Sequence, residues 1–159
     1  MCQIYRLTSD FAPSHAPAGT VPAMTTGTGP DAATLVASMP FAAALGVEVV
    51  SATADEVRGG LAWAPERTTA GGVLHGGALM ALADSLGAVC AFLNLPAGAA
   101  TSTIESKTNF LRGVRSGRVT ATSTPLHVGR TTIVVQTDIR DDRDKRVALV
   151  IQTQAVIPA

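Results

Sequence analysis

The chain has 159 residues, the length of one domain that can build its own hydrophobic core. Its 12 Lys and Arg balance 12 Asp and Glu, so no net charge favours binding to nucleic acid or to a membrane surface. The two cysteines do not suggest a disulfide framework, the three histidines are far apart, and the N-terminus lacks the pattern of a signal peptide. We therefore expect a cytoplasmic protein with no metal and no cofactor.

Residues 1–30 are rich in Pro, Gly, Ser, Thr and Ala without a sustained hydrophobic period, so we expect a flexible tail before a domain at residues 31–159. The domain opens with an Asp31 cap, apolar residues at helical spacing and a stop signal at Gly46. Pro40 interrupts the helical pattern, which therefore predicts two short helices.

Residues 47–63 follow, and their pattern predicts two strands joined by a turn near Asp55. A loop rich in Pro, Thr and Gly then leads into one long helix from about Gly77 to Leu93, which the sequence LPAGAA ends. The apolar run is long enough to suggest a membrane span. However, Asp84 at its middle and the absence of flanking basic residues favour a buried helix.

Four segments with alternating or β-branched residues complete the chain, at 101–112, 117–128, 130–141 and 146–157. Short polar turns separate the last three, which predicts an antiparallel meander. A helix that is apolar nearly all round has to be covered on most sides. The predicted fold class is therefore α+β, with a strongly curved antiparallel sheet wrapped around one long central helix.

Asp84 is the one charged residue between His75 and Glu105. Burying an unpaired carboxylate among apolar side chains is costly, so this residue is expected to serve a purpose. One purpose is chemistry. The plainer alternative is a structural carboxylate that accepts hydrogen bonds from Ser85 or from a partner's backbone.

The motif LHGGALMALADSLG, with a Gly-rich loop before it and TIESKTNFLR about twenty residues later, resembles the hotdog-fold thioesterases. Within them it is most similar to the phenylacetyl-CoA thioesterase (PaaI-like) branch. The resemblance covers roughly residues 35–157, including the order of the elements. It implies hydrolysis of an acyl-CoA thioester, in which the acidic residue nine positions after the motif His75 acts as nucleophile or general base. That residue is Asp84.

The same resemblance assigns roles to neighbouring residues. The backbone N–H of Gly76 polarises the thioester carbonyl, His75 shapes that pocket, and Thr103 on the following strand assists. Gly77 lets the substrate approach the backbone closely. The family often has Asn or Gln six positions before the His, where this chain has Thr69 at a substrate-binding position.

Helix geometry adds a condition on assembly. Gly76 and Asp84 are eight residues apart, about 12 Å along a helix. One thioester carbon cannot lie about 3 Å from both groups, so the two must come from different subunits if both act on it. A homodimer with two shared sites is then required, and the resemblance adds a homotetramer built from two such dimers.

The phosphates of CoA call for basic side chains at the mouth of the site. Arg112, which follows NFL, and the HVGR turn with Gly129 and Arg130 are the candidates, with solvated surface charge as the alternative. Aryl, arylacetyl and medium-chain acyl groups all fit this description of the substrate.

Two other functions stay open. The first is a hotdog enoyl-CoA hydratase or dehydratase, in which His75 and Asp84 form an acid–base pair at the acyl chain. The second is a non-catalytic acyl-CoA-binding protein, which the departure at Thr69 favours.

Overall fold

The computed structural model describes residues 4–5 and 32–158. Its elements are β1 (Ile4–Tyr5), α1 (Ala32–Ala37), α2 (Pro40–Leu45), β2 (Glu48–Ala52), β3 (Val57–Ala62), the 3₁₀ turn η1 (Pro65–Arg67), α3 (Gly76–Phe92), β4 (Ala100–Phe110), β5 (Arg118–Val128), β6 (Thr132–Asp141) and β7 (Arg146–Ile157). From α1 onward this is the predicted order. In the described part, no helix is long and apolar enough to cross a membrane.

The two short helices near the N-terminus are confirmed. Pro40 is the first residue of α2, where its missing N–H costs no hydrogen bond. Gly46 ends α2 in the left-handed conformation, with φ of 80°, and its N–H bonds back to Ala43. The predicted cap Asp31, like most of the predicted tail, lies outside the described residues.

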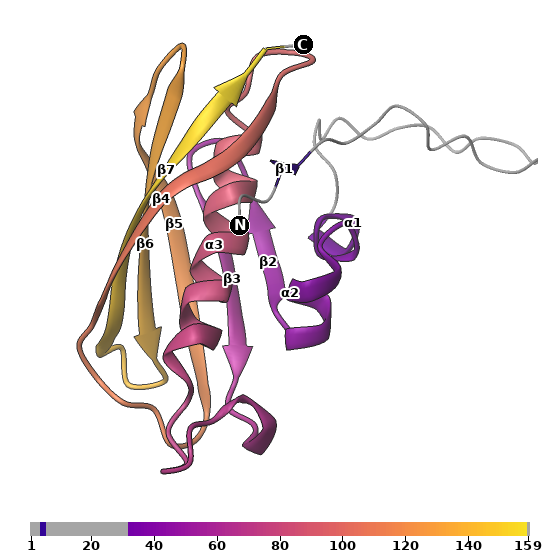
Figure 1. The fold of residues 1–159 in the computed structure, drawn as a ribbon. Coiled ribbons are helices and arrows are strands. Elements are labelled where there is room, and N and C mark those ends of the chain that lie inside the picture. Colours follow the sequence, from indigo (N-terminus) through magenta and orange to yellow (C-terminus); the bar gives the residue numbers. More distant parts are fainter. Residues whose placement is uncertain (1–3, 6–31, 159) are drawn as a thin grey trace, which may run out of the picture.

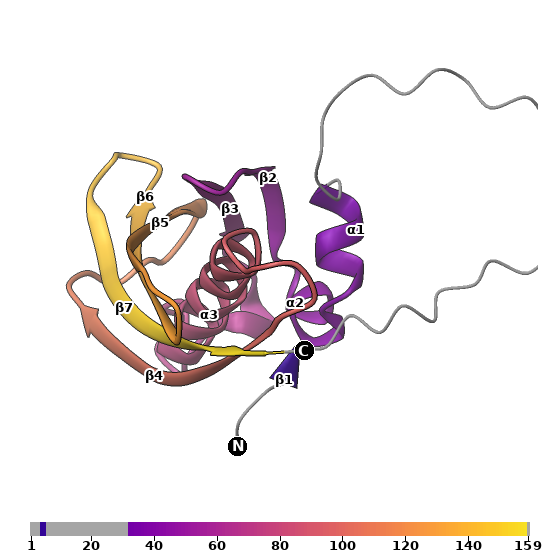
Figure 2. The same ribbon diagram turned by 90° about the horizontal axis from the view of Figure 1, so that it is seen from above.

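All strands pair antiparallel in one sheet, in the order β1-β4-β7-β6-β5-β3-β2. The predicted meander of the last three strands is confirmed, because β5, β6 and β7 are neighbours in sequence and in space. Figure 1 shows α3 lying along the concave side of the sheet. Seen from above, the sheet curves around α3, and α1 and α2 lie beside β2 (Figure 2). The predicted fold class is therefore confirmed.

The core lies between α3 and the concave face of the sheet. Most of the helix is buried, and the fully buried large side chains come from both sides of the contact: Leu82 and Leu86 from α3, with Val57, Leu61, Val119, Ile133, Val135, Ile139, Val147 and Val150 from the strands. Inward and outward residues alternate along β6, as expected for a strand with one face on a core. Against this apolar background, each buried polar residue needs a reason.

The β4 strand forms one edge of the sheet. One hydrogen-bonding edge of β4 pairs with β7 over the whole strand, whereas β1 covers only Thr101 and Ser102 on the other edge. From Ile104 to Phe110, no strand of the described chain pairs with that second edge. Ile104 and Phe110 are also more than half exposed, at 59% and 52%. A long open edge with apolar side chains is a template for another strand. The pairing by β1 was not predicted from the sequence.

Gly59 is required by close packing at the centre of β3. A Cβ there would overlap the backbone carbonyl oxygen of Glu48 and approach both methyls of Leu86 to 2.9–3.0 Å. We therefore expect Gly59→Ala to lower the free energy of unfolding by about 1–3 kcal/mol, the usual cost of overpacking. Thermal and urea unfolding measure this. Gly71→Ala is the matched control, because its nearest neighbour would lie 3.9 Å away. Equal stability of the two variants would contradict the packing described here.

Candidate functional site

Asp84 lies in the middle of α3, half-buried on the side of the helix that faces β4 and β7. Its Oδ1 accepts a hydrogen bond of 3.0 Å from the hydroxyl of Thr103 on β4. Burial raises the pKa of the Asp84 carboxyl above its ordinary value, and the hydrogen bond from Thr103 opposes that rise. The structure thus brings together two predicted site residues, Asp84 on α3 and Thr103 on β4, which are nineteen residues apart in sequence.

His75 is the N-cap residue of α3. Its Nδ1 accepts a hydrogen bond of 2.8 Å from the N–H of Gly77, so the side chain satisfies one of the helix's free donors. With Nδ1 acting as an acceptor, the neutral ring carries its proton on Nε2. His75 lies about 13 Å along the helix from Asp84, so one chain does not place them as an acid–base pair.

Gly76 is the first residue of α3, one earlier than predicted. No described residue accepts a hydrogen bond from its N–H, which leaves that donor at the positive end of the helix for an oxyanion. The ring of Phe110 lies against Gly76, 3.0 Å from where a Cβ would be. Thus Gly76 lies near the last residue of β4, whereas Asp84 lies near Thr103 at its beginning.

A small pocket opens at the start of α3, between α2 and the loop that precedes the helix. The residues around it are Phe41, Leu45, Glu66, Arg67, Thr68, His75, Gly77 and Ala78. Its apolar wall comes from α2 and Ala78, and its polar wall from the loop. The α2 residues and Arg67 were not predicted as site residues, because only the folded chain brings them next to the HGG motif.

The remaining predicted residues are spread over the surface. Thr69 is exposed in the tight turn before α3, and its neighbour Thr68 lines the pocket instead. Arg112 is exposed just beyond the end of β4, near the start of α3. Gly129 and Arg130 form the turn between β5 and β6, at the opposite end of the sheet from Arg112. One chain therefore does not bring Arg112 and Arg130 together.

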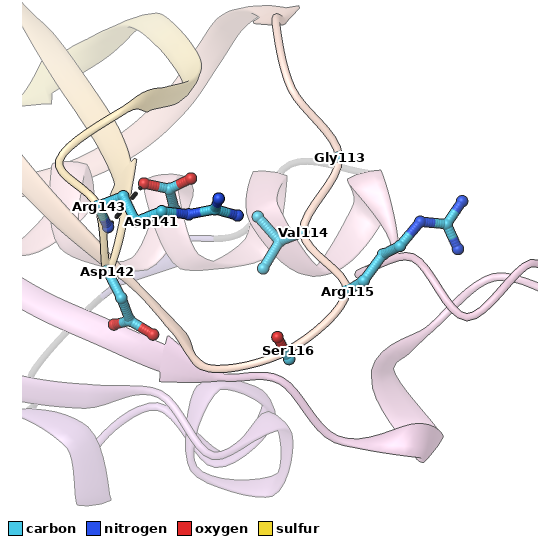
Figure 3. Close-up of a pocket in the computed structure, with 7 residues that line it drawn as sticks. All are labelled: Gly113, Val114, Arg115, Ser116, Asp141, Asp142 and Arg143. Carbon is cyan, nitrogen blue, oxygen red and sulfur yellow. Dashed lines mark hydrogen bonds between the residues drawn. The ribbon is translucent and has the colours of Figure 1, made fainter.

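A second pocket lies between the 113–116 loop and the turn joining β6 to β7 (Figure 3). Its two carboxylates are engaged in shaping the backbone: Asp141 accepts from the N–H groups of Arg143 and Lys145, and Asp142 from that of Arg118. Figure 3 shows Arg115 pointing away from both acids, and it donates to the carbonyl of Gly71. No residue predicted to act on the substrate lines this pocket.

Cys90 and the metal-binding potential of the chain complete the description of the site. Cys90 is buried on α3, and burial raises the pKa of its thiol to about 11. This thiol is therefore a poor nucleophile at neutral pH. Within residues 4–5 and 32–158, no group of three His, Cys, Asp or Glu side chains could hold a metal ion.

Two glutamines on β7 were missed by the sequence analysis. Gln152 and Gln154 are fully buried and point toward α3, where Gln154 contacts Thr103 and Gln152 lies beside Asp84. The available signal was the pattern VALVIQTQAVI, in which two amides occupy the alternate positions that continue inward from Val150. Buried polar residues of this kind are informative because they are rare.

Comparisons with known proteins identify the family of the chain. Residues 71–148 match the model of the thioesterase superfamily. The structure of a mutant of thioesterase PA1618 from Pseudomonas aeruginosa superposes with a TM-score of 0.77 and 32% identity, covering 82% of this chain and 96% of that one. The structure of thioesterase HI1161 from Haemophilus influenzae superposes with a TM-score of 0.71 and 34% identity, covering 74% of this chain and 82% of that one.

Among curated proteins, a 1,4-dihydroxy-2-naphthoyl-CoA hydrolase from Escherichia coli is 36% identical over 74 residues, which is 46% of this chain and 54% of that protein. The chain spans 53% to 61% of the length of the first curated relatives that it matches. The structural matches extend further along their chains, over 96% and 82% of them. The chain therefore belongs to the thioesterase superfamily, and its fold is the hotdog fold of that family.

Proposed function

We propose that this protein hydrolyses an acyl-CoA thioester to the free acid and CoA. One observation carries the proposal: a single carboxylate, Asp84, lies half-buried in the apolar helix α3 with Oδ1 held by Thr103. A poorly solvated carboxylate is a stronger base and nucleophile than one in water. The Escherichia coli relative named as a hydrolase of an aryl-CoA ester supports CoA thioesters as the substrate class.

The reaction can be written with the residues of this chain. Asp84 either attacks the thioester carbon or takes a proton from a water that attacks it. The carbonyl oxygen becomes an oxyanion and accepts a hydrogen bond from the N–H of Gly76. The C–S bond then breaks and the CoA thiolate leaves, which needs no strong acid and no cofactor. In the nucleophilic route, water afterwards hydrolyses the acyl anhydride formed on Asp84.

This mechanism requires two subunits, and β4 suggests how they are arranged. In one chain, Asp84 lies beside Thr103 near the beginning of β4, and Gly76 lies beside Phe110 at its end. Thr103 and Phe110 are roughly 23 Å apart along the strand, and Asp84 and Gly76 are about 12 Å apart along the helix. If the open β4 edges of two copies pair antiparallel, the two-fold axis places the beginning of one beside the end of the other. Asp84 then approaches the partner's Gly76. A tetramer would pair two such dimers.

The acyl group is proposed to enter the pocket at the start of α3. Phe41, Leu45 and Ala78 give it an apolar wall that suits an aryl, arylacetyl or medium-chain group. His75 contributes as the helix cap that holds Gly76 and Gly77 in place. For the CoA phosphates we retain Arg112, because the same two-fold axis would bring the partner's Gly129 and Arg130 to its end of the sheet. Thr69 keeps only a peripheral role in the turn.

Thiol release from a panel of CoA esters tests the proposal. Phenylacetyl, benzoyl, hydroxybenzoyl, hexanoyl and acetyl esters are offered to the full chain, and at least one aryl or medium-chain ester is expected to release CoA. Binding of esters without release would instead establish a non-catalytic acyl-CoA-binding protein. Loss of the conjugated absorbance of an enoyl-CoA would establish a hydratase.

A further inference from the structure

Four polar side chains of the sheet lie beneath Asp84 in one continuous network. Thr101 and Thr103 come from β4, and Gln152 and Gln154 come from the neighbouring β7. Thr101, Gln152 and Gln154 are each 0% exposed, in a core that is largely apolar. Burying amides and hydroxyls there is costly unless each is hydrogen-bonded, so the network is expected to serve the one carboxylate that it surrounds.

The direction of the hydrogen bonds follows from what each group can donate. An ionised carboxylate can only accept, so the Thr103 hydroxyl, 3.0 Å from Oδ1 of Asp84, donates its one proton to Asp84. Oγ1 of Thr103 therefore accepts from Gln154, whose Nε2 lies 2.7 Å away. This turns Oε1 of Gln154 toward Thr101, whose hydroxyl lies 3.2 Å from that oxygen and 2.9 Å from the carbonyl oxygen of Ala155.

The two oxygens of the Asp84 carboxylate are consequently unequal. The hydrogen bond from Thr103 and the longer approach of Gln152 Nε2, at 3.5 Å, both end on Oδ1. Among the described residues, none donates to Oδ2. Oδ1 is thus held by the sheet, and Oδ2 is the oxygen left for water or substrate.

We propose that Gln154 is a positioning residue: it fixes the Thr103 hydroxyl as a donor to Oδ1 of Asp84, so that Oδ2 is presented to the reacting thioester. This inference rests on the proposed function for the meaning of that presentation. Gln154 touches no substrate and acts through Thr103. Thr101, whose hydroxyl is shared between Oε1 of Gln154 and the carbonyl oxygen of Ala155, completes this relay of hydrogen bonds.

The neighbouring amide of Gln152 differs from Gln154. Its side chain is packed against Gly87, with Cδ only 2.5 Å from where a Cβ of that glycine would lie. Its Oε1 is buried without a hydrogen-bond partner among the described residues, and its Nε2 reaches Asp84 only at 3.5 Å. At such a distance the hydrogen bond is weak. The short hydrogen bonds are those from Gln154 to Thr103 and from Thr103 to Asp84, so this pair sets the orientation of the Asp84 carboxylate.

Other ionisable groups around α3 do not compete with this relay. On β4, Glu105 and Lys107 lie opposite Thr153 and Ile151, on the outer face of the sheet. The charged groups on or beside the other strands are paired at the surface or exposed there: Glu48 with Arg118, Glu56 with Arg58, Asp138 with Arg140 and Arg146, and His127. In α3 itself, Cys90 is the one other titratable residue.

The test compares Gln154→Met with wild type in the full chain. Met has nearly the length of Gln and packs flexibly, but it cannot donate to Thr103. Without Gln154, the Thr103 hydroxyl is no longer fixed as a donor to Asp84. We expect kcat for the preferred ester to fall about tenfold, the size of one lost hydrogen bond to a charged group, with KM unchanged. Because the bond from Thr103 favours the ionised carboxylate of Asp84, the acidic limb of the pH profile should move to higher pH. Gln136→Met, on the outer face of β6, is the matched control and should change neither kcat nor the position of the acidic limb.

A double-mutant cycle shows whether Gln154 acts through Thr103. Thr103→Val should reproduce the loss, and Gln154→Met should then add nothing further. Thr103→Ser, which keeps the hydroxyl, should restore the wild-type profile. If Gln154→Met does not fold, Thr101→Val tests the same relay with Gln154 in place and should shift the limb in the same direction. Additive losses, or an unmoved acidic limb in a folded variant, would overturn the proposal.

A readout independent of turnover separates this inference from the proposed function. The ¹³C signal of the Asp84 carboxyl, assigned by its absence in Asp84→Asn, reports the ionisation of that group directly. Its titration midpoint should rise in Gln154→Met and in Thr103→Val, whether or not any ester is hydrolysed. If wild type releases no thiol, the thioesterase proposal fails, yet a raised midpoint still supports the relay. An unchanged midpoint in both variants would contradict it.

Discussion

Replacing Asp84 with Asn is expected to lower kcat for the preferred acyl-CoA ester by about 10²-fold or more, the usual contribution of a positioned base or nucleophile. Asn keeps the shape of the side chain and can still accept from Thr103, but it cannot attack a carbonyl or take a proton. KM should stay close to the wild-type value, because the pocket at the start of α3 is untouched. Thiol release at saturating and limiting ester concentrations measures both parameters.

The pH dependence follows from the direction of the pKa shift. Activity needs the ionised carboxylate, so it should fall as the pH falls through the pKa of Asp84, which burial raises. Since the folded state binds this proton more tightly than the unfolded state, the charged carboxylate opposes folding above that pKa. Asp84→Asn should therefore be as stable as wild type or more so. Glu105→Gln is the control, because it also replaces a carboxylate with an amide, but on the outer face of β4. An equal loss of activity in Glu105→Gln would contradict the catalytic role of Asp84.

Mixing two inactive variants is expected to restore activity if the site is shared. One variant is Asp84→Asn and the other is Gly76→Val, whose side chain would collide with the ring of Phe110 and obstruct the N–H of the first helical turn. In a heterodimer, one site carries both lesions and the other carries neither. Random assortment makes half of the dimers mixed, so co-refolded protein should recover about a quarter of wild-type kcat.

The control for this experiment uses two lesions on the same side of the site. Asp84→Asn mixed with Thr103→Val should recover far less, because every site of such a mixture contains at least one lesion at the carboxylate. Size-exclusion chromatography of each mixture confirms that dimers have formed. A monomer with full activity, or equal recovery in both mixtures, would show that one chain completes the site and that Gly76 and Asp84 do not act together.

Much of the fold was predictable because it depends on local patterns. The apolar run around Asp84 predicted a wrapped helix, Pro40 and Gly46 predicted the break and the end of the short helices, and the turns separated the last strands correctly. The pairing of β1 was not predicted, since a strand of two residues has no period to detect. The neighbour relation of β4 and β7 was not predictable either, because it joins segments about fifty residues apart.

The site was predictable only in part, for a related reason. The carboxylate and the hydroxyl were identified from the resemblance to the hotdog-fold thioesterases, and the structure places Thr103 against Asp84. Gln154 was missed because its contact with Thr103 exists only once β7 lies beside β4. Arg112 and Arg130 were both predicted to bind the CoA phosphates, although β5 carries the chain to the other end of the sheet between them.

The central position of β7 also affects how the protein is made. The ribosome synthesises α3 and β4 before β5, β6 and β7, yet β7 is the strand that joins β4 to the rest of the sheet. Until β7 emerges, β4 lacks its main pairing strand and the sheet does not fully cover α3. The nascent chain therefore exposes apolar surface and an unpaired strand edge that are prone to aggregation. The sheet can therefore close only after β7 has emerged, and chaperones can bind the exposed surface before then. The strand that carries Gln152 and Gln154 closes the structure last.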